Sequence, residues 1–183
     1  MVDVLHTAAR TADGTVVWTL LDAVAGATLA VTPLDLVAAS ASRTVQVRFD
    51  GHFVPRSRLT GTMPYAQWPD RDAAGLRGNG SLALGVAGRC LHLIGAGAGP
   101  LREELAETRN VLDAATPQTM PEARAAASAF AMRAATALVV TAGSRSVLAG
   151  EHPQRLVREA MFLLVFGSRP AIRGALLRPY RLR

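Results

Sequence analysis

The sequence predicts an α+β protein in which a partial antiparallel β sheet is followed by an up-down bundle of helices. Up to residue 61, short runs of β-branched and apolar residues alternate with turn-forming residues, which is typical of strands. From about residue 79, apolar residues recur at helical spacing and the loops are short, which favours antiparallel helices. We therefore expect a partial β domain over 1–61, a connector over 62–78 and a helical bundle domain over 79–183.

The first part should contain four strands. Val45, Val47 and Phe49 alternate with polar residues, which indicates a strand that is buried on one face. Turn residues at 12–14 (Ala-Asp-Gly) and 50–51 (Asp-Gly) separate the runs. The expected strands are Val2–Ala9, Thr15–Leu21, Thr28–Val31 and Thr44–Val54. A sheet of this size has open edges, so it should pack on helices or pair with another chain.

The second part should contain four main helices and a short fifth one. In the first of them, Gly85 and Gly88 should allow another helix to approach closely. The sequence GAGAGP at Gly95–Pro100 then ends this helix. A phosphate-binding loop would need a preceding strand and a following lysine, so we interpret this segment as a plain turn. The expected helices are Ser81–Ile94, Leu101–Ala115, Pro121–Ala142, His152–Phe166 and Pro170–Leu177.

Composition narrows the class of protein. All twenty basic residues are arginines and the net charge is +6, but aromatic residues make up only 5% of the chain. A nucleic-acid-binding surface would combine basic and aromatic residues, so we expect no nucleic acid partner. No uninterrupted apolar run approaches the ~18 residues of a membrane helix, so we expect no membrane span. The single Cys90 fits a core thiol in a reducing, cytoplasmic compartment.

No side chain stands out as a catalytic group or metal ligand. Glu159 lies four residues after Arg155, a spacing typical of an ion pair on a helix surface. Glu151 precedes a helix start, where a negative charge favours the helix dipole, and His152 beside it is interpreted as structural. The remaining histidines have no partner at the spacing of metal ligands. We expect no metal and no catalytic residue.

Four segments carry a family resemblance. The segment Gly150–Arg173, GEHPQRLVREAMFLLVFGSRPAIR, resembles the last helices of acyl-CoA dehydrogenases, which are flavoenzymes that oxidise acyl-CoA thioesters. The segment Val47–Gly61 resembles the pattern V-x-F-D-x-V-x-V-P-x-x-x-L-L-G that leaves the middle β domain of that family. Ser81–Leu91 is similar to the first long helix of the family's C-terminal domain. Ala142–Ser144 falls where the family has a Phe-Gly-Gly turn near the flavin.

The resemblance covers the late middle β domain and the C-terminal helical domain, and the family's N-terminal half has no counterpart. Many members place the catalytic glutamate directly after the apolar turn that follows the Arg-Glu-Ala step. That position corresponds to Gly167, followed by Ser168. A minority carry the base on the first long helix, but no carboxylate lies near Leu76–Gly80; Asp72 is the nearest upstream. The resemblance therefore implies an oxidoreductase of CH-CH groups in fatty acid metabolism whose base is missing.

The resemblance also implies FAD, lost from this chain or shared with a partner. Gly143 and Ser144 could approach the nucleotide through backbone N–H groups, or could simply end a helix. Arg169 and Arg173 could bind a nucleotide phosphate. These two belong to seven arginines between residues 155 and 183 that could also meet an acyl-CoA or an acidic partner subunit, or form a solvated helix face and a frayed tail.

Two functions of different classes remain open. The chain is expected to be a non-catalytic or half-site subunit of a flavin-dependent acyl-CoA dehydrogenase that assembles as a homo- or hetero-oligomer. Alternatively, it is a non-enzymatic helical interaction or scaffold protein that has lost flavin binding. A third possibility is that Met1 is not the true start, in which case the upstream sequence should encode a strand similar to Trp-Ile-Thr.

Overall fold

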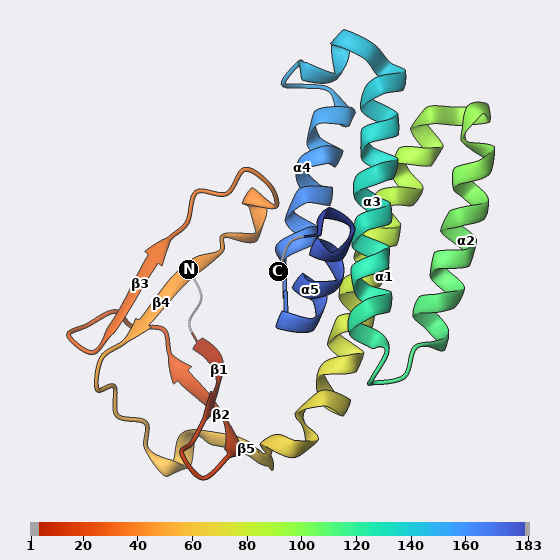
Figure 1. Ribbon diagram of the computed structural model, residues 1–183. Coiled ribbons are helices and arrows are strands. Elements are labelled where there is room, and N and C mark those ends of the chain that lie inside the picture. Colours follow the sequence, from red (N-terminus) through yellow and green to blue (C-terminus); the bar gives the residue numbers. More distant parts are fainter. Residues whose placement is uncertain (1–3, 182–183) are drawn as a thin grey trace. The chain divides into compact units, whose positions relative to one another are not determined.

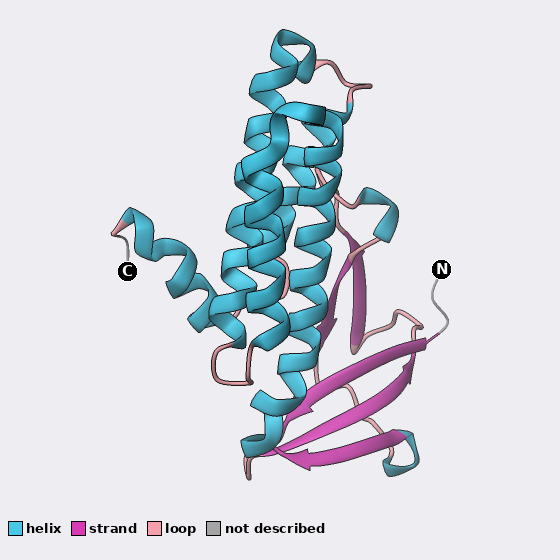
Figure 2. Ribbon diagram, turned by 90° about the vertical axis from the view of Figure 1, so that its right-hand side faces the viewer, coloured by secondary structure: helices cyan, strands magenta, loops and turns pink. Residues whose placement is uncertain are grey.

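A computed structural model describes residues 4–181 of the chain. These residues form two compact units, which divide between Trp68 and Pro69. The predicted α+β class is confirmed, because strands fill the first unit and helices the second (Figure 2). Val2 and Asp3 of the expected first strand, and Arg183 at the basic end, lie outside the described residues.

The first unit holds two antiparallel sheets rather than one. The larger sheet has the strand order β1-β2-β5, and β3 pairs with β4 in the smaller one. At the β1–β2 turn, the Asp13 carboxylate accepts the Thr15 N–H at 3.2 Å, and Gly14 takes a φ of +82° that favours glycine. The strands are β1 (Val4–Arg10), β2 (Thr15–Asp22), β3 (Leu29–Pro33), β4 (Val45–Phe49) and β5 (Leu59–Pro64).

The fifth strand is absent from the sequence-based prediction. The expected last strand, Thr44–Val54, ends at Phe49, and Leu59–Pro64 forms β5 beside β2. This strand contains polar threonines, Gly61 and Pro64. It is difficult to predict from the sequence pattern, because glycine and proline are rare in strand interiors. Gly61 lies opposite Trp18, where a β-carbon would be 3.9 Å from the indole. Pairing with β2 therefore overrides weak local propensity.

The first unit buries little apolar surface among its described residues. Its large side chains with the least exposure are Val16, Leu21 and Leu29, whereas Phe53 is 83% exposed. A cluster of stacked rings at its end joins Trp18, Trp68 and Tyr65, with the Arg10 guanidinium 4.6 Å from the Tyr65 ring centroid. A sheet with so few buried residues has a small hydrophobic contribution to its stability.

The second unit is a bundle of long helices. In Figure 1, α1 to α4 run alongside one another, and Figure 2 shows α5 leaving the bundle at an angle. The four long helices and their short connections confirm the predicted up-down bundle. The helices are α1 (Trp68–Ile94), α2 (Gly99–Ala114), α3 (Met120–Ala142), α4 (His152–Val165) and α5 (Pro170–Leu177).

The first helix begins thirteen residues before the expected start at Ser81, inside the segment interpreted as a connector. Pro69 occupies the first turn, where its missing N–H costs nothing, and Asp70 places a negative charge near the positive helix end. Ala73 and Leu76 are buried and continue the apolar face of α1. The glycines of this segment suggested a break, but burial of this face keeps the residues helical.

Arginines from neighbouring helices satisfy the carbonyl groups at two helix ends. Arg77 on α1 donates from Nη1 to the carbonyls of Leu112 and Asp113 at the end of α2, at 2.8 and 3.0 Å. In the reverse direction, Arg102 on α2 donates from Nη2 to the carbonyl of Leu91 on α1 at 3.1 Å. These bonds satisfy carbonyls near the helix ends and place charge favourably for the helix dipole.

The core of the second unit forms around α3. Alanines dominate its buried face and allow the other helices to approach closely, with Phe130 as the largest apolar side chain in the helix's core. By length and composition alone, the stretches 65–114 and 120–147 could each cross a membrane. The packing of α3 against α2, α4 and α5 explains its apolar character as that of a core helix.

The close helix approach lies at Gly80, not at Gly85 or Gly88. A β-carbon at Gly80 would be 2.7 Å from Leu112 of α2, whereas Gly85 faces open space and Gly88 has only an ordinary contact at 3.9 Å with Leu105. The expectation for Gly85 and Gly88 was wrong because it assumed that α1 begins after Gly80. In the longer helix, the turn that meets the end of α2 lies further upstream.

Replacing Gly80 with alanine should destabilise the bundle. Gly80→Ala places its methyl group against the buried Leu112, at a cost of about 1–3 kcal/mol that exceeds the helix-propensity gain of about 1 kcal/mol. Gly78→Ala is the matched control, because it lies on the same helix in open space and should stabilise. Urea unfolding measures both, and equal stability changes would contradict the close approach.

Candidate functional site

The turn after α4 is fixed by two polar side chains from α3. Arg124 donates from Nη2 to the Leu163 carbonyl at 2.8 Å and to the Phe166 carbonyl at 3.3 Å. Ser128 donates from Oγ to the same Leu163 carbonyl at 3.0 Å. These bonds satisfy the end of α4 and define where Gly167 begins the next segment.

Arg124 is only 1% exposed, which is unusual for an arginine. Burial lowers the pKa of its guanidinium from the ordinary value, but an arginine remains charged at neutral pH. Among the described residues, its Nε and Nη1 have no hydrogen-bond partner. The bundle therefore carries a buried positive charge at the turn that precedes the predicted base position.

The two predicted positions for a base, Gly167 and the segment Leu76–Gly80, lie against each other. Gly167 has a φ of +60°, and a β-carbon there would be 2.7 Å from Nδ2 of Asn79 on α1. Gly167 therefore has the left-handed conformation that glycine adopts most easily, and an amide rather than a carboxylate faces it from α1. Asn79 lies within Leu76–Gly80, the predicted position of the alternative base. The fold therefore brings the two positions together.

Asp72 is bound to Arg169. The Arg169 guanidinium donates from Nε and Nη2 to the two carboxylate oxygens of Asp72, at 3.0 and 2.8 Å. This two-point contact links the start of α1 to the start of α5 and matches the geometry that arginine and carboxylate prefer. It engages the nearest carboxylate upstream of Leu76–Gly80 and also uses the guanidinium that was expected to bind a nucleotide phosphate.

The residues expected to bind a flavin form two separate groups. Gly143 and Ser144 are exposed before α4, whereas Arg169 and Arg173 follow it. Helix α4 has 14 residues, which corresponds to a length of about 21 Å. The Gly143 N–H bonds to the Val139 carbonyl and ends α3. The residues expected to bind a flavin therefore lie toward opposite ends of α4.

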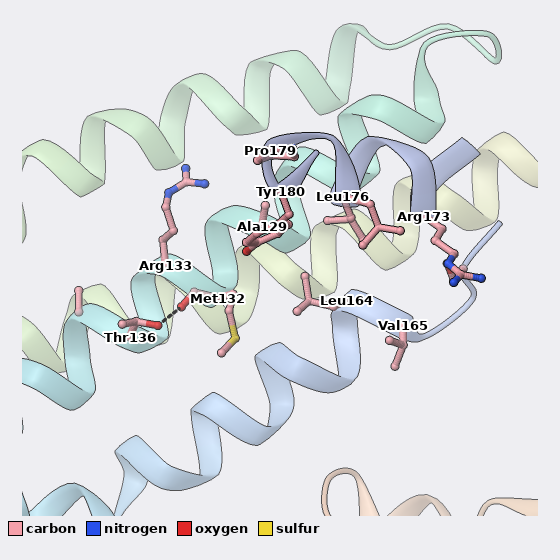
Figure 3. Close-up of a pocket in the computed structure, with 13 residues that line it drawn as sticks. Ala129, Met132, Arg133, Thr136, Leu164, Val165, Arg173, Leu176, Pro179 and Tyr180 are labelled. Carbon is pink, nitrogen blue, oxygen red and sulfur yellow. Dashed lines mark hydrogen bonds between the residues drawn. The ribbon is translucent and has the colours of Figure 1, made fainter. Parts of the chain in front are cut away.

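A groove of about 870 Å³ lies between α3, α4 and α5 (Figure 3). Apolar side chains of the three helices line it, with arginines at its rim and no carboxylate among the described lining residues. Sequence reading missed this groove, because its lining was assigned to ordinary apolar helix faces. The residues that define it are Met132, Arg133, Leu164, Val165, Arg173 and Leu176.

Comparison with known proteins shows which solved structures share this fold. No family model matches the sequence, and no curated protein matches it. Solved structures match nearly the whole chain. The match to acyl-CoA dehydrogenase from Geobacillus kaustophilus has 14% identity and a TM-score of 0.73. It covers 98% of this chain and 57% of the Geobacillus chain. A glutaryl-CoA dehydrogenase from Mycobacterium smegmatis in complex with FADH2 is 17% identical with a TM-score of 0.70, covering 99% and 56%.

A third match is the ChsE4–ChsE5 complex from Mycobacterium tuberculosis, at 20% identity and a TM-score of 0.64, covering 98% of this chain and 55% of that chain. The chain has the fold of part of an acyl-CoA dehydrogenase. It spans just over half the length of the solved proteins it matches. The resemblance seen in the sequence is thus confirmed as a similarity of fold.

The two carboxylates of the segment Gly150–Arg173 form surface ion pairs. Glu159 accepts a hydrogen bond from Arg155 at 2.5 Å, as the i,i+4 spacing predicted. Glu151 precedes α4 as expected, but its carboxylate pairs with Arg145 at 2.6 Å rather than bonding to the helix N–H groups. Both acids are therefore already bound to an arginine. His152 lies 3.3 Å from Arg155 and contacts no acid in the described structure.

Cys90 is a core thiol, as predicted. It is fully buried in α1, and burial raises the pKa of its thiol to about 11, with the charge of Glu159 adding to the effect. The thiol therefore stays protonated at neutral pH and is a poor nucleophile. No cluster of three or more potential metal ligands occurs in the part of the chain that the structure describes.

The contact between Gly167 and Asn79 predicts a coupled pair of substitutions. Gly167→Ala should destabilise the helical unit by about 1–2 kcal/mol for its left-handed backbone, and further because its methyl group meets Asn79. Adding Asn79→Ala should recover the second part. Gly95→Ala, with a φ of +80° and open space around it, is the control for the backbone cost alone. Strictly additive effects in urea unfolding would show that Asn79 does not restrict this position.

Proposed function

We propose that this chain is a non-catalytic or half-site subunit of a flavin-dependent acyl-CoA dehydrogenase assembly. In this assembly the α,β-desaturation of an acyl-CoA thioester takes place with a base from a partner chain. The chain keeps the helical bundle and lacks an acid at the predicted base position. The observation that carries this proposal is that a glycine occupies the predicted base position. Gly167 has a left-handed backbone, and a β-carbon there would meet Asn79. We place the assembly in the cytoplasm.

The proposed chemistry requires a group that removes a proton from the acyl-CoA. A positioned base contributes about 10²–10⁴-fold in rate, so an assembly without one would be a poor dehydrogenase. Asp72 is held by Arg169, and Glu151 and Glu159 by their own arginines. These three acids are therefore engaged by arginines, which supports a base from another polypeptide.

The flavin, when bound, would accept the hydride in such an assembly. Because Gly143 and Ser144 lie at one end of α4 and Arg169 and Arg173 at the other, one chain does not surround a nucleotide. Two chains could bring opposite ends together, so the four residues favour a flavin shared across an interface. One structure that shares the fold contains FADH2 and another is a complex of two named proteins, which supports this reading by analogy.

Exposed apolar surface in the β unit supports the need for a partner. The β unit, with its small buried core and exposed side chains such as Phe53, has apolar surface that further strands could cover. A homo- or hetero-oligomer with another acyl-CoA dehydrogenase-like subunit would supply both the strands and the base.

Visible absorption of the purified protein tests this proposal. We expect the chain alone, mixed with FAD and then desalted, to be colourless, because its flavin-binding groups are separated. Co-expression with the product of the adjacent gene should yield a complex with a flavin band. The partner purified alone is the control that shows whether flavin retention requires this chain.

Two results would count against the proposed subunit. A flavin band in the chain alone would mean that one polypeptide binds the cofactor without help. A stable complex that stays colourless with added FAD and oxidises no acyl-CoA would favour a non-enzymatic scaffold protein.

A further inference from the structure

The groove between α3, α4 and α5 shares only Arg173 with the residues of the proposed flavin site, and the proposed function gives its aliphatic lining no role. Its volume of about 870 Å³ falls in the range of small-molecule sites, about 300–1,000 Å³. Helix α5 leaves the bundle at an angle (Figure 2), and residues of α3, α4 and α5 line the groove. All three helices belong to the same compact unit.

The floor and walls of the groove are aliphatic. Met132 on α3, Leu164 on α4 and Leu176 on α5 are half-buried side chains that line it, and Val165 is 67% exposed at its edge. Tyr180 is the one aromatic residue among the described lining residues. Flexible aliphatic chains fill such a surface better than a flat ring, because few rings are available for stacking.

The rim of the groove is basic. In Figure 3, Arg133 and Arg173 lie toward opposite ends of the residues drawn, with Met132, Leu164 and Leu176 between them. Arg133 is paired with Glu104 of α2. Arg173 has no ion pair or side-chain hydrogen bond among the described residues, and Ser168 is the nearest hydroxyl-bearing lining residue in the chain. The Arg173 guanidinium is therefore the group in the described part of the groove that is free to form an ion pair with a bound anion.

The geometry points to a binding site for a free aliphatic monocarboxylate. We propose that the aliphatic chain lies along Met132, Leu164 and Leu176 and that the carboxylate meets Arg173. This inference goes beyond the proposed dehydrogenase subunit and does not depend on flavin or on a base. The same charges disfavour a second copy of this chain in the groove, because a twofold contact would bring two basic rims of a +6 chain together.

Binding of laurate to the purified chain, measured by titration calorimetry, tests the site. We expect saturable binding of one laurate per chain, and dodecanol, which has the same chain without the charge, should bind about tenfold more weakly or worse. Arg173→Gln should reduce laurate affinity to the level of dodecanol. Arg109→Gln removes an exposed arginine on α2 outside the groove and should leave binding unchanged.

A second variant separates loss of the site from loss of the fold. Val165→Glu adds a negative charge at an exposed position of the groove, so it should abolish laurate binding while circular dichroism stays that of the parent chain. Absence of saturable laurate binding, or equal binding by the Arg173→Gln variant, would overturn the proposal.

Two further probes distinguish other occupants. Binding of lauroyl-CoA without binding of laurate would mean that the site recognises the CoA ester instead, and displacement of laurate by ADP would assign Arg173 to a nucleotide; either result would overturn the proposal. Light scattering gives the oligomeric state. A dimer that Val165→Glu converts to monomer, with no laurate binding by the parent, would place a second copy in the groove and would also overturn it.

Discussion

The contact of Arg124 and Ser128 with the Leu163 carbonyl is the interaction on which the rest of the helical unit depends. It joins the central helix α3 to the end of α4 and satisfies carbonyls that would otherwise be buried without partners. The turn at Gly167, the position of α5 and therefore the groove all follow from where α4 ends. A buried arginine is a costly way to hold a turn, since two of its nitrogens have no partner among the described residues.

This turn shows how an acyl-CoA dehydrogenase-like fold can form without an acid at the predicted base position. The packing that defines the end of α4 does not need an acid at the next position, and Gly167 fits the turn because its φ is positive. Asn79 lies in the space that a side chain would take. The acids nearby serve in ion pairs, as Asp72 does with Arg169. The bundle thus keeps its structure with a glycine of positive φ at the predicted base position.

The sequence predicted the fold class and the helices from α2 onward, because these depend on local patterns of apolar residues. It missed β5 and the first turns of α1, where pairing with β2 and burial of Leu76 override glycines and prolines that suggest loops. It also missed Asn79 against Gly167 and the bond between Asp72 and Arg169, since residues 88 and 97 positions apart meet only after the helices pack. The groove depends on the angle of α5, which no local pattern encodes.

Exchange of the α-protons of an acyl-CoA tests most directly whether this chain lacks a base. The purified chain, with and without FAD, is incubated with butyryl-CoA in D₂O, and proton NMR follows the loss of the signal of the protons next to the thioester. Because a glycine occupies the predicted base position, we expect exchange no faster than in buffer alone. Exchange that the chain accelerates would contradict this account, because it would require a base that the described structure does not provide.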